Sequence, residues 1–258
     1  MARGLIERVA AASEAASRDG AAARAAGSPA GTLTLLRHGE SEWNRAGRFT
    51  GWADVGLTAA GEAEAARAGE ALLAGGYAFD RCFTSALQRA ILSGEIVLRT
   101  MGLASVAVER SWRLNERHYG ALQGLGAWSA VRRFGVLPVL RARHGYDYRP
   151  PAPDAGGLPD ARTAAGASAA APPPGESLAD VRTRVVPFWH ERIAPELARG
   201  RSVLVVSHKH ALRALFALLT GRDGAPSLRV ATGVPFVLTL DGALTVTEYR
   251  ALRLPPAR

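Results

Sequence analysis

The chain has 258 residues, of which 48% are hydrophobic, so it is long enough to bury one sizeable globular core. Its net charge of +9 suits nucleic acid or an acidic small ligand, but the arginines are scattered and not interleaved with aromatic residues, which argues against nucleic acid. No apolar run is long enough to span a membrane. The single cysteine, Cys82, excludes an intramolecular disulfide and fits a reducing, cytoplasmic setting.

The N-terminal residues 1–30 are rich in alanine and lack the apolar stretch of a secretory signal. We expect them to form a loosely ordered extension, followed by a single domain over residues 31–250. That domain opens with a buried strand at residues 32–36, directly followed by Arg37, His38 and Gly39. Because ligands in open α/β sheets bind at the carboxyl ends of strands, His38 lies where a site is expected.

Strands and helices alternate along the rest of the domain. We expect strands at residues 79–83, 105–108 and 203–206, helices at 58–74, from 85, and at 127–134, 177–198 and 210–219, and a terminal hairpin of 235–240 with 243–249. This alternation predicts a parallel sheet with helices on both faces. A long segment rich in Pro, Ala and Gly, residues 150–175, lacks periodicity and is placed to act as a lid.

Three features indicate a bound anion: a second strand that leads to a histidine, an arginine beside the first histidine, and an arginine in the first turn of a helix. A second buried strand, at residues 203–206, also leads into a histidine, His208. A lone histidine is more often an ordinary turn residue, but two strands that each lead to one, with Arg37 beside His38, indicate convergence on an anion. Ser85 and Gln88 predict a capping box at the start of a helix, and Arg89 in its first turn opposes the helix dipole, as a cation that binds a ligand would.

The ordered set of motifs resembles one known family. LLRHGESEWN, RFTGWADVGLTAAGEAEA, FTSALQRA, SWRLNERHYGALQG, PPPGESLADVRTRVVPFWHERIAPEL and VLVVSHKHALRAL occur in the order typical of the histidine phosphatase superfamily and, more narrowly, of cofactor-dependent phosphoglycerate mutases. The resemblance covers residues 33–240. It implies a three-layer α/β/α fold with a mostly parallel sheet, and metal-independent phosphoryl transfer through a phosphohistidine that 2,3-bisphosphoglycerate primes.

The resemblance also assigns roles. His38 is the expected nucleophile, Arg37, Arg89 and His208 hold the phosphoryl oxygens, and Glu116 is the general acid and base, which requires a raised pKa. We expect the rings of His38 and His208 to face one phosphorus from opposite sides. The expected substrate-binding residues are Ser41, Asn44, Thr50, Gly51, Arg117, Tyr119, Arg143, His144, Lys209 and His210. The partner is a small phosphorylated metabolite, and a homo-oligomer is compatible with the resemblance.

Three positions depart from the family pattern. Gly126 and Ala127 stand where the family has Asn-Lys, Arg143 and His144 replace paired arginines, and Lys209 with His210 replaces Gly-Asn. Lys209 either supplies the cation missing at Ala127 or points to solvent. The ordered motif set and the insertion favour interconversion of 3- and 2-phosphoglycerate, and the three departures leave hydrolysis of another phosphorylated metabolite as the alternative. A non-catalytic sensor of phosphorylated ligands is a third hypothesis.

Overall fold

The computed structural model describes residues 31–153, 173–221 and 230–256, so the expected extension at 1–30 and most of the expected lid at 150–175 lie outside it. Within these ranges the chain builds a six-stranded sheet in the order β3-β2-β4-β1-β5-β6. The strands are β1 (Leu33–Arg37), β2 (Arg81–Thr84), β3 (Val108–Arg110), β4 (Val203–Ser207), β5 (Pro235–Leu240) and β6 (Val246–Ala251). Only β5 runs against the other strands of this sheet, which confirms the predicted mostly parallel α/β fold.

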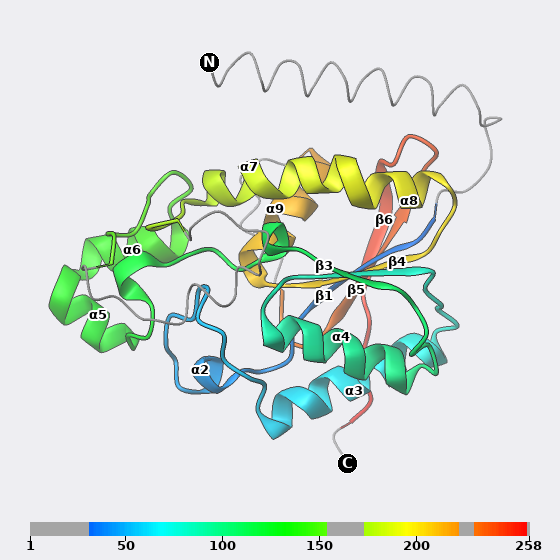
Figure 1. Cartoon of the computed structure of the whole chain (residues 1–258), viewed down its shortest axis with the longest axis horizontal. Coiled ribbons are helices and arrows are strands. Elements are labelled where there is room, and N and C mark those ends of the chain that lie inside the picture. The colour runs from blue at the N-terminus through cyan, green and yellow to red at the C-terminus, as the bar shows by residue number, and fades with distance from the viewer. Residues whose placement is uncertain (1–30, 154–172, 222–229, 257–258) are drawn as a thin grey trace.

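Helices cover both faces of the sheet (Figure 1). On one face lie α3 (Ala59–Ala74) and α4 (Gln88–Thr100), and on the other α7 (Leu178–Phe188), a π-helical turn (Trp189–Ile193), α8 (Ala194–Ala198) and α9 (Lys209–Thr220). Successive residues of a strand point to opposite faces. In β4, Val203 and Val205 accordingly join the core under α7 and α9, whereas Leu204 and Val206 join the core under α3 and α4. Both central strands are thus buried on two sides, as their continuous apolar runs predicted.

Side chains cap the starts of α3 and α7. The Thr58 hydroxyl accepts from the Gly61 N–H at the start of α3, and Ser177 with Asp180 forms a capping box at the start of α7. The capping box predicted from Ser85 is wrong, because α4 begins at Gln88 after Leu87 and has no side-chain cap. The Gln88 N–H is instead bonded to Asp54, and the Ser85 hydroxyl is used elsewhere.

Three short helices lie outside the two main layers, α2 (Glu42–Arg45), α5 (Ala127–Phe134) and α6 (Val136–His144). The helices α5 and α6 project from the sheet (Figure 1) and pack on a small third core. No helix was expected at α6, and Pro138 lies near its start. Pro138 falls in the first turn of α6, where its missing N–H costs no helical hydrogen bond.

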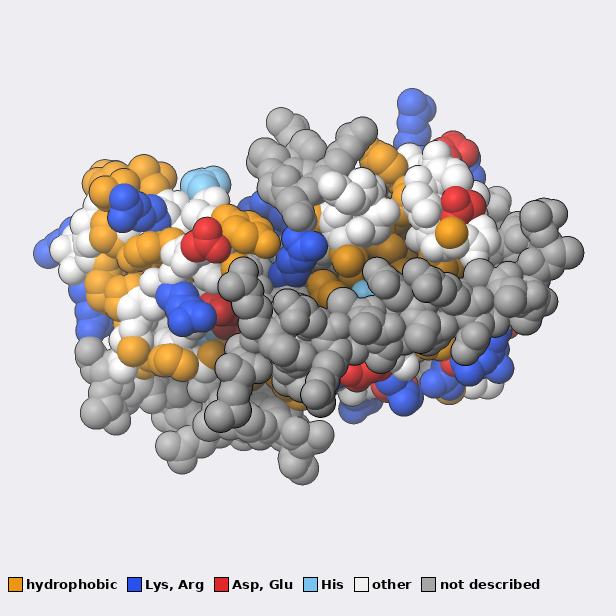
Figure 2. Space-filling model, turned by 90° about the horizontal axis from the view of Figure 1, so that it is seen from above, with side chains coloured by type: hydrophobic (Ala, Val, Ile, Leu, Met, Phe, Trp, Pro, Cys, Tyr) orange, Lys and Arg blue, Asp and Glu red, His pale blue; other side chains and the backbone are white. Residues whose placement is uncertain are grey.

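The surface of the α5 and α6 region carries hydrophobic and basic side chains together (Figure 2). Its exposed hydrophobic residues are Trp128, Val136, Leu137 and Leu140. Among the helices in the described ranges, none combines the length and the apolar character needed to cross a membrane.

At the edges of the sheet, two strands begin later in the chain than predicted, β3 and β6. The strand expected at 105–108 is formed by Val108–Arg110, which pairs with β2 from Cys82 to Thr84. In the terminal hairpin, the Asp241 carboxylate accepts from the N–H groups of Ala243 and Thr245, so the turn extends to residue 245 before β6 begins.

Cys82 is buried in the core under α4, and burial raises the pKa of its thiol to about 12. Cys82 is therefore a core residue with an unreactive thiol.

Candidate active site

The two histidines meet because their strands are neighbours. β1 and β4 pair in parallel, with Arg37 opposite Ser207, and the His38 N–H donates to the Ser207 carbonyl at 3.1 Å. His38 and His208 therefore leave the sheet side by side, with ring centroids 4.8 Å apart and planes tilted by 55°. Both are almost fully buried. This spacing leaves no room for a phosphorus between the rings, so the expectation that they face it from opposite sides is wrong. His208 can reach only an oxygen of a phosphoryl group carried by His38.

The environment of His38 leaves one of its ring nitrogens unprotonated. Its Nδ1 lies 2.7 Å from the Gly39 carbonyl, which can only accept, so Nδ1 carries the proton and Nε2 keeps its lone pair. Burial, followed by the charges of Arg89 and Arg37, lowers the pKa of His38 well below its usual value. The ring is therefore neutral at cellular pH, as a nucleophile must be.

The Gly39 backbone is fixed against α3 and α4. A Cβ at this position would lie 2.1 Å from the Gly61 carbonyl oxygen, and the Gly39 N–H donates to the Ser93 hydroxyl at 3.0 Å. Only glycine allows the strand end to approach α3 so closely. This contact holds the carbonyl that selects the protonated nitrogen of His38.

His208 differs from His38 in the ring nitrogen that its surroundings occupy, which is Nε2. Its Nε2 lies 2.7 Å from the Ser85 hydroxyl, and that oxygen already accepts from the Leu87 N–H at 3.2 Å. We assign the hydroxyl proton to the bond with Nε2, which leaves the remaining proton of His208 on Nδ1. This Nδ1 is buried and has no partner among the described residues. His208 thus presents a free N–H donor beside His38. The sequence pattern assigned Ser85 to a helix cap and missed this contact with His208, although Ser85 follows β2, the strand next to β4.

Two arginines flank the histidine pair. Arg89 is 1% exposed, and its terminal nitrogens donate to the carbonyls of Ala53 and Gly51, both at 2.8 Å. Burial lowers the pKa of Arg89 to about 10, which leaves it charged at neutral pH. Arg37 donates from one terminal nitrogen to the Val230 carbonyl at 3.0 Å. The Nε atoms of both arginines are buried without a partner in the described structure.

Glu116 faces the pair across the pocket. Its Oε1 accepts from the Arg117 N–H at 2.8 Å, the His210 N–H at 3.2 Å and the His210 Nδ1 at 3.0 Å. These hydrogen bonds all end on Oε1, which leaves Oε2 to exchange a proton with a ligand. Burial alone would raise the pKa of Glu116, but the electrostatic interaction with the N–H dipole of His210 and its hydrogen bond, followed by the interaction with His208, hold this pKa well below its usual value. The raised pKa expected from the sequence is therefore wrong for the free site.

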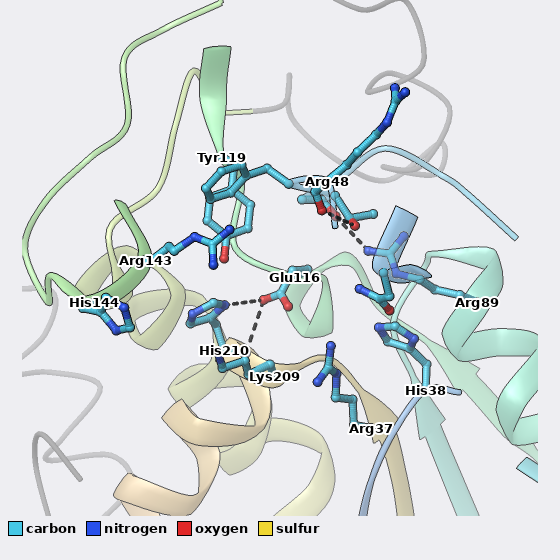
Figure 3. Close-up of a pocket in the computed structure, with 14 residues that line it drawn as sticks. Arg37, His38, Arg48, Arg89, Glu116, Tyr119, Arg143, His144, Lys209 and His210 are labelled. Carbon is cyan, nitrogen blue, oxygen red and sulfur yellow. Dashed lines mark hydrogen bonds and ion pairs between the residues drawn. The ribbon is translucent and has the colours of Figure 1, made fainter. Parts of the chain in front are cut away.

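The carboxylate, the first histidine and the two arginines open into one pocket of about 190 Å³ (Figure 3). Five lysine or arginine side chains and one carboxylate line it, so it favours a polyanion. Its lining residues are Arg37, His38, Asn44, Arg48, Phe49, Thr50, Gly51, Arg89, Glu116, Tyr119, Arg143, His144, Lys209 and His210. Sequence reasoning missed Arg48. Its position two residues before Thr50, in the same loop, could have indicated that it lines the pocket.

Two expected substrate-binding residues do not line this pocket. Ser41 is the N-cap of α2, where it forms a capping box with Asn44. Arg117 is fully buried, and its guanidinium donates to the carbonyls of Glu176, Ala142 and Tyr148 at 2.6 to 2.8 Å. Arg117 thus ties the loop of Glu116 to the end of α6, the helix that carries Arg143 and His144. Its contribution to the pocket is the position of those residues.

Comparison with known proteins agrees with this geometry. Residues 33–235 match the model of the histidine phosphatase superfamily, branch 1. The 2,3-bisphosphoglycerate-dependent phosphoglycerate mutase of Nitratidesulfovibrio vulgaris is 45% identical over 232 residues, which cover 87% of this chain and 92% of the relative. The protein of the same name from Caulobacter vibrioides is 44% identical, with 86% and 94% covered.

Solved structures give the same fold. A mycobacterial glucosyl-3-phosphoglycerate phosphatase superposes with a TM-score of 0.63 at 26% identity, covering 86% of this chain and 97% of that one. Bacillus stearothermophilus YhfR gives a TM-score of 0.64 at 26% identity, with 84% and 94% covered. The chain therefore belongs to branch 1 of the histidine phosphatase superfamily, with relatives among its 2,3-bisphosphoglycerate-dependent phosphoglycerate mutases.

Proposed function

We propose that this protein interconverts 3-phosphoglycerate and 2-phosphoglycerate through a phosphohistidine at His38. One observation carries the chemistry. Three buried N–H donors have no partner among the described residues, namely the Nε atoms of Arg37 and Arg89 and the Nδ1 of His208, and they belong to the side chains around the Nε2 of His38. Buried donors are nearly always satisfied in native proteins, so this group is built for the oxygens of a phosphoryl group. The names of the closely similar relatives support the choice of phosphoglycerate.

The proposed cycle starts with His38 phosphorylated. A glycerate hydroxyl attacks the phosphorus, the new O–P bond forms as the Nε2–P bond breaks, and Oε2 of Glu116 takes the hydroxyl proton. His38 Nε2 then attacks the other phosphoryl group of the bound product, its P–O bond breaks, and the leaving oxygen takes the proton back from Glu116. A low pKa suits the first half of this cycle, in which Glu116 must act as a base.

The charges in the pocket also fit a bisphosphate primer. Arg37 and Arg89 lie at the His38 end, and Arg48, Arg143 and Lys209 add further cations to the lining. 2,3-Bisphosphoglycerate would supply the phosphoryl group that first loads His38. With arginines to neutralise the phosphoryl oxygens, we propose a reaction without a metal ion, on a small phosphorylated metabolite in the cytoplasm.

Lys209 bears on the alternative function. Ala127 begins α5 after the N-cap Gly126, and neither residue supplies a cation to the pocket. This absence favours hydrolysis of another phosphorylated metabolite, an activity also named for the mycobacterial phosphatase. Lys209, however, is half-buried and lines the pocket, and burial lowers its pKa. We propose that Lys209 supplies the cation missing at Ala127, which favours the mutase.

The deciding experiment is a coupled assay of 3-phosphoglycerate conversion, with and without 2,3-bisphosphoglycerate, run beside phosphate release from a panel of phosphorylated metabolites. We expect primer-dependent mutase turnover that exceeds every phosphatase rate. A phosphatase rate above the mutase rate would select the alternative, and ligand binding without labelling of His38 would select the sensor.

A further inference from the structure

The side chain of His210 contacts Glu116 from the start of α9. His210 is the second residue of α9 and is 2% exposed, so it is a core residue as well as part of the pocket lining. The family pattern has asparagine here, so the imidazole is a property of this chain. Its Nε2 is buried and has no partner in the described structure, whereas its Nδ1 contacts Glu116.

We propose that His210 is a positioning residue that holds Oε1 of Glu116, so that Oε2 is the oxygen that exchanges the proton with the substrate. The proposal rests on the assignment of Glu116 as general acid and base. Its basis is that His210 donates two hydrogen bonds to Oε1 of Glu116, from its backbone N–H at 3.2 Å and from its ring Nδ1 at 3.0 Å (Figure 3). Two donors from one residue fix both the place and the rotation of the carboxylate.

The ring itself is fixed on its other side. The Tyr119 ring meets it edge to face, with centroids 6.0 Å apart and planes at 77°. The start of α9 fixes its backbone, because the N-cap is the buried His208 of the histidine pair. The position of Oε1 is thereby tied to the strand end that also carries the phosphoryl-binding ring. Proton transfer and phosphoryl binding share one rigid support.

The neutrality of His210 matters as much as its position. A carboxylate only accepts, so the Nδ1 of His210 carries the proton of that bond. Burial lowers the pKa of His210, although Glu116 opposes this shift, and the ring is neutral. A neutral donor orients Glu116 and still lets Oε2 accept a proton, whereas a permanent positive charge at 3.0 Å would oppose that protonation.

The test uses the basicity of the leaving group. Proton donation by Glu116 matters for an alkyl phosphate and hardly at all for p-nitrophenyl phosphate, whose leaving oxygen is stable without a proton. For each variant we would measure kcat/KM with 3-phosphoglycerate and with p-nitrophenyl phosphate and take their ratio. Glu116→Gln should lower this ratio about 100-fold, the lower limit for general acid and base catalysis.

The His210 variants decide the inference. His210→Phe keeps the ring and its packing but removes the donor, and should lower the ratio about tenfold. His210→Asn keeps a neutral donor and should stay within about threefold of the wild type, and His190→Asn is the control at an exposed histidine. An equal loss with both substrates for His210→Phe, or no loss, would refute the positioning role. An unchanged ratio for Glu116→Gln would instead refute the proposed role of Glu116.

A second measurement covers variants with poor turnover. Infrared titration of the free protein, with Glu116→Gln to identify the band, gives the pKa of Glu116 directly. Loss of the ring donor in His210→Phe should raise this pKa by at least about one unit, and His210→Asn should raise it less. If His210→Phe does not fold, His210→Leu serves in both experiments. An unshifted pKa in a folded variant without the donor overturns the inference.

Discussion

Replacing Arg184 by methionine tests what holds the Glu116 loop in place. The Arg184 guanidinium forms a two-point ion pair with Glu176 at 2.7 and 2.9 Å, and both side chains are about 95% buried, with exposures of 6% and 5%. The same guanidinium donates to the carbonyls of Arg113, Asn115 and Glu116 at 2.8 to 2.9 Å. One side chain therefore satisfies a buried carboxylate and three carbonyls of the loop.

The expected cost follows from what the substitution leaves behind. Removing one partner of a buried ion pair costs about 3–5 kcal/mol, because the other charge stays buried without compensation. The carbonyls of Arg113 and Asn115 each add about 1–3 kcal/mol unless water reaches them, whereas the Glu116 carbonyl keeps the indole N–H of Trp52 at 2.6 Å. We therefore expect Arg184→Met to lose at least about 4 kcal/mol of a total that is about 5–15 kcal/mol for native domains. Glu176→Gln should lose less, because the three carbonyls keep their donor.

Urea unfolding, followed by circular dichroism and tryptophan fluorescence, gives these free energies. Arg110→Gln is the matched control, since it breaks an exposed pair with Glu95 at 3.2 Å and should cost less than about 1 kcal/mol. In Arg184→Met protein that still folds, mutase turnover should fall, because the Glu116 carbonyl has lost a donor. A loss in Arg184→Met no larger than in the control would refute this account of the loop.

Three further predictions concern the site and its supports. His38→Ala should abolish turnover and labelling by phosphoryl donors without a change in circular dichroism, and residual turnover would exclude His38 as the nucleophile. Burial, partly opposed by Glu176, lowers the pKa of His118 to about 4, so below pH 6.5 the unfolded protein binds a proton that the folded protein does not. The free energy of unfolding should therefore fall by about 3 kcal/mol between pH 6.5 and 4. His118→Gln should remove this part of the pH dependence when urea unfolding is measured across that range, and an unchanged pH dependence would contradict the assignment. Gly39→Ala, whose Cβ would lie 2.1 Å from a backbone oxygen, should lower both the melting temperature and turnover, whereas Gly56→Ala, with no atom within 4 Å, should change neither measurably; equal effects would refute the close-approach argument.

The central part of the site could be predicted because it depends on local patterns. Two buried apolar runs that lead to histidines place His38 and His208 at the same edge of a parallel sheet, and the pairing of β1 with β4 confirms it. Arg89 follows the same logic, since it opens a helix that starts at this edge. In each case a few neighbouring residues determine where the side chain lies.

The remaining features depend on contacts between distant residues. The low pKa of Glu116 arises from His210, which is 94 residues away in the chain. Arg117 stands in the same dense motif as Glu116, but each of its three guanidinium nitrogens donates to a backbone carbonyl that only the folded chain brings to it. Composition and spacing give the charge of such side chains and not the groups that will surround them.

The pairing of β1 with β4 has a consequence for how this enzyme tolerates changes in length. Because Arg37 lies opposite Ser207, the positions of the His38 and His208 rings are matched by hydrogen bonds between strands and not by the long stretch of chain that separates them. Insertions in the connecting helices and loops should leave the match intact. One residue added within β4 would shift His208 by about 3.3 Å and exchange the inward and outward faces of the strand. Natural and designed variants are therefore expected to vary in size between these strands and to keep constant length within them.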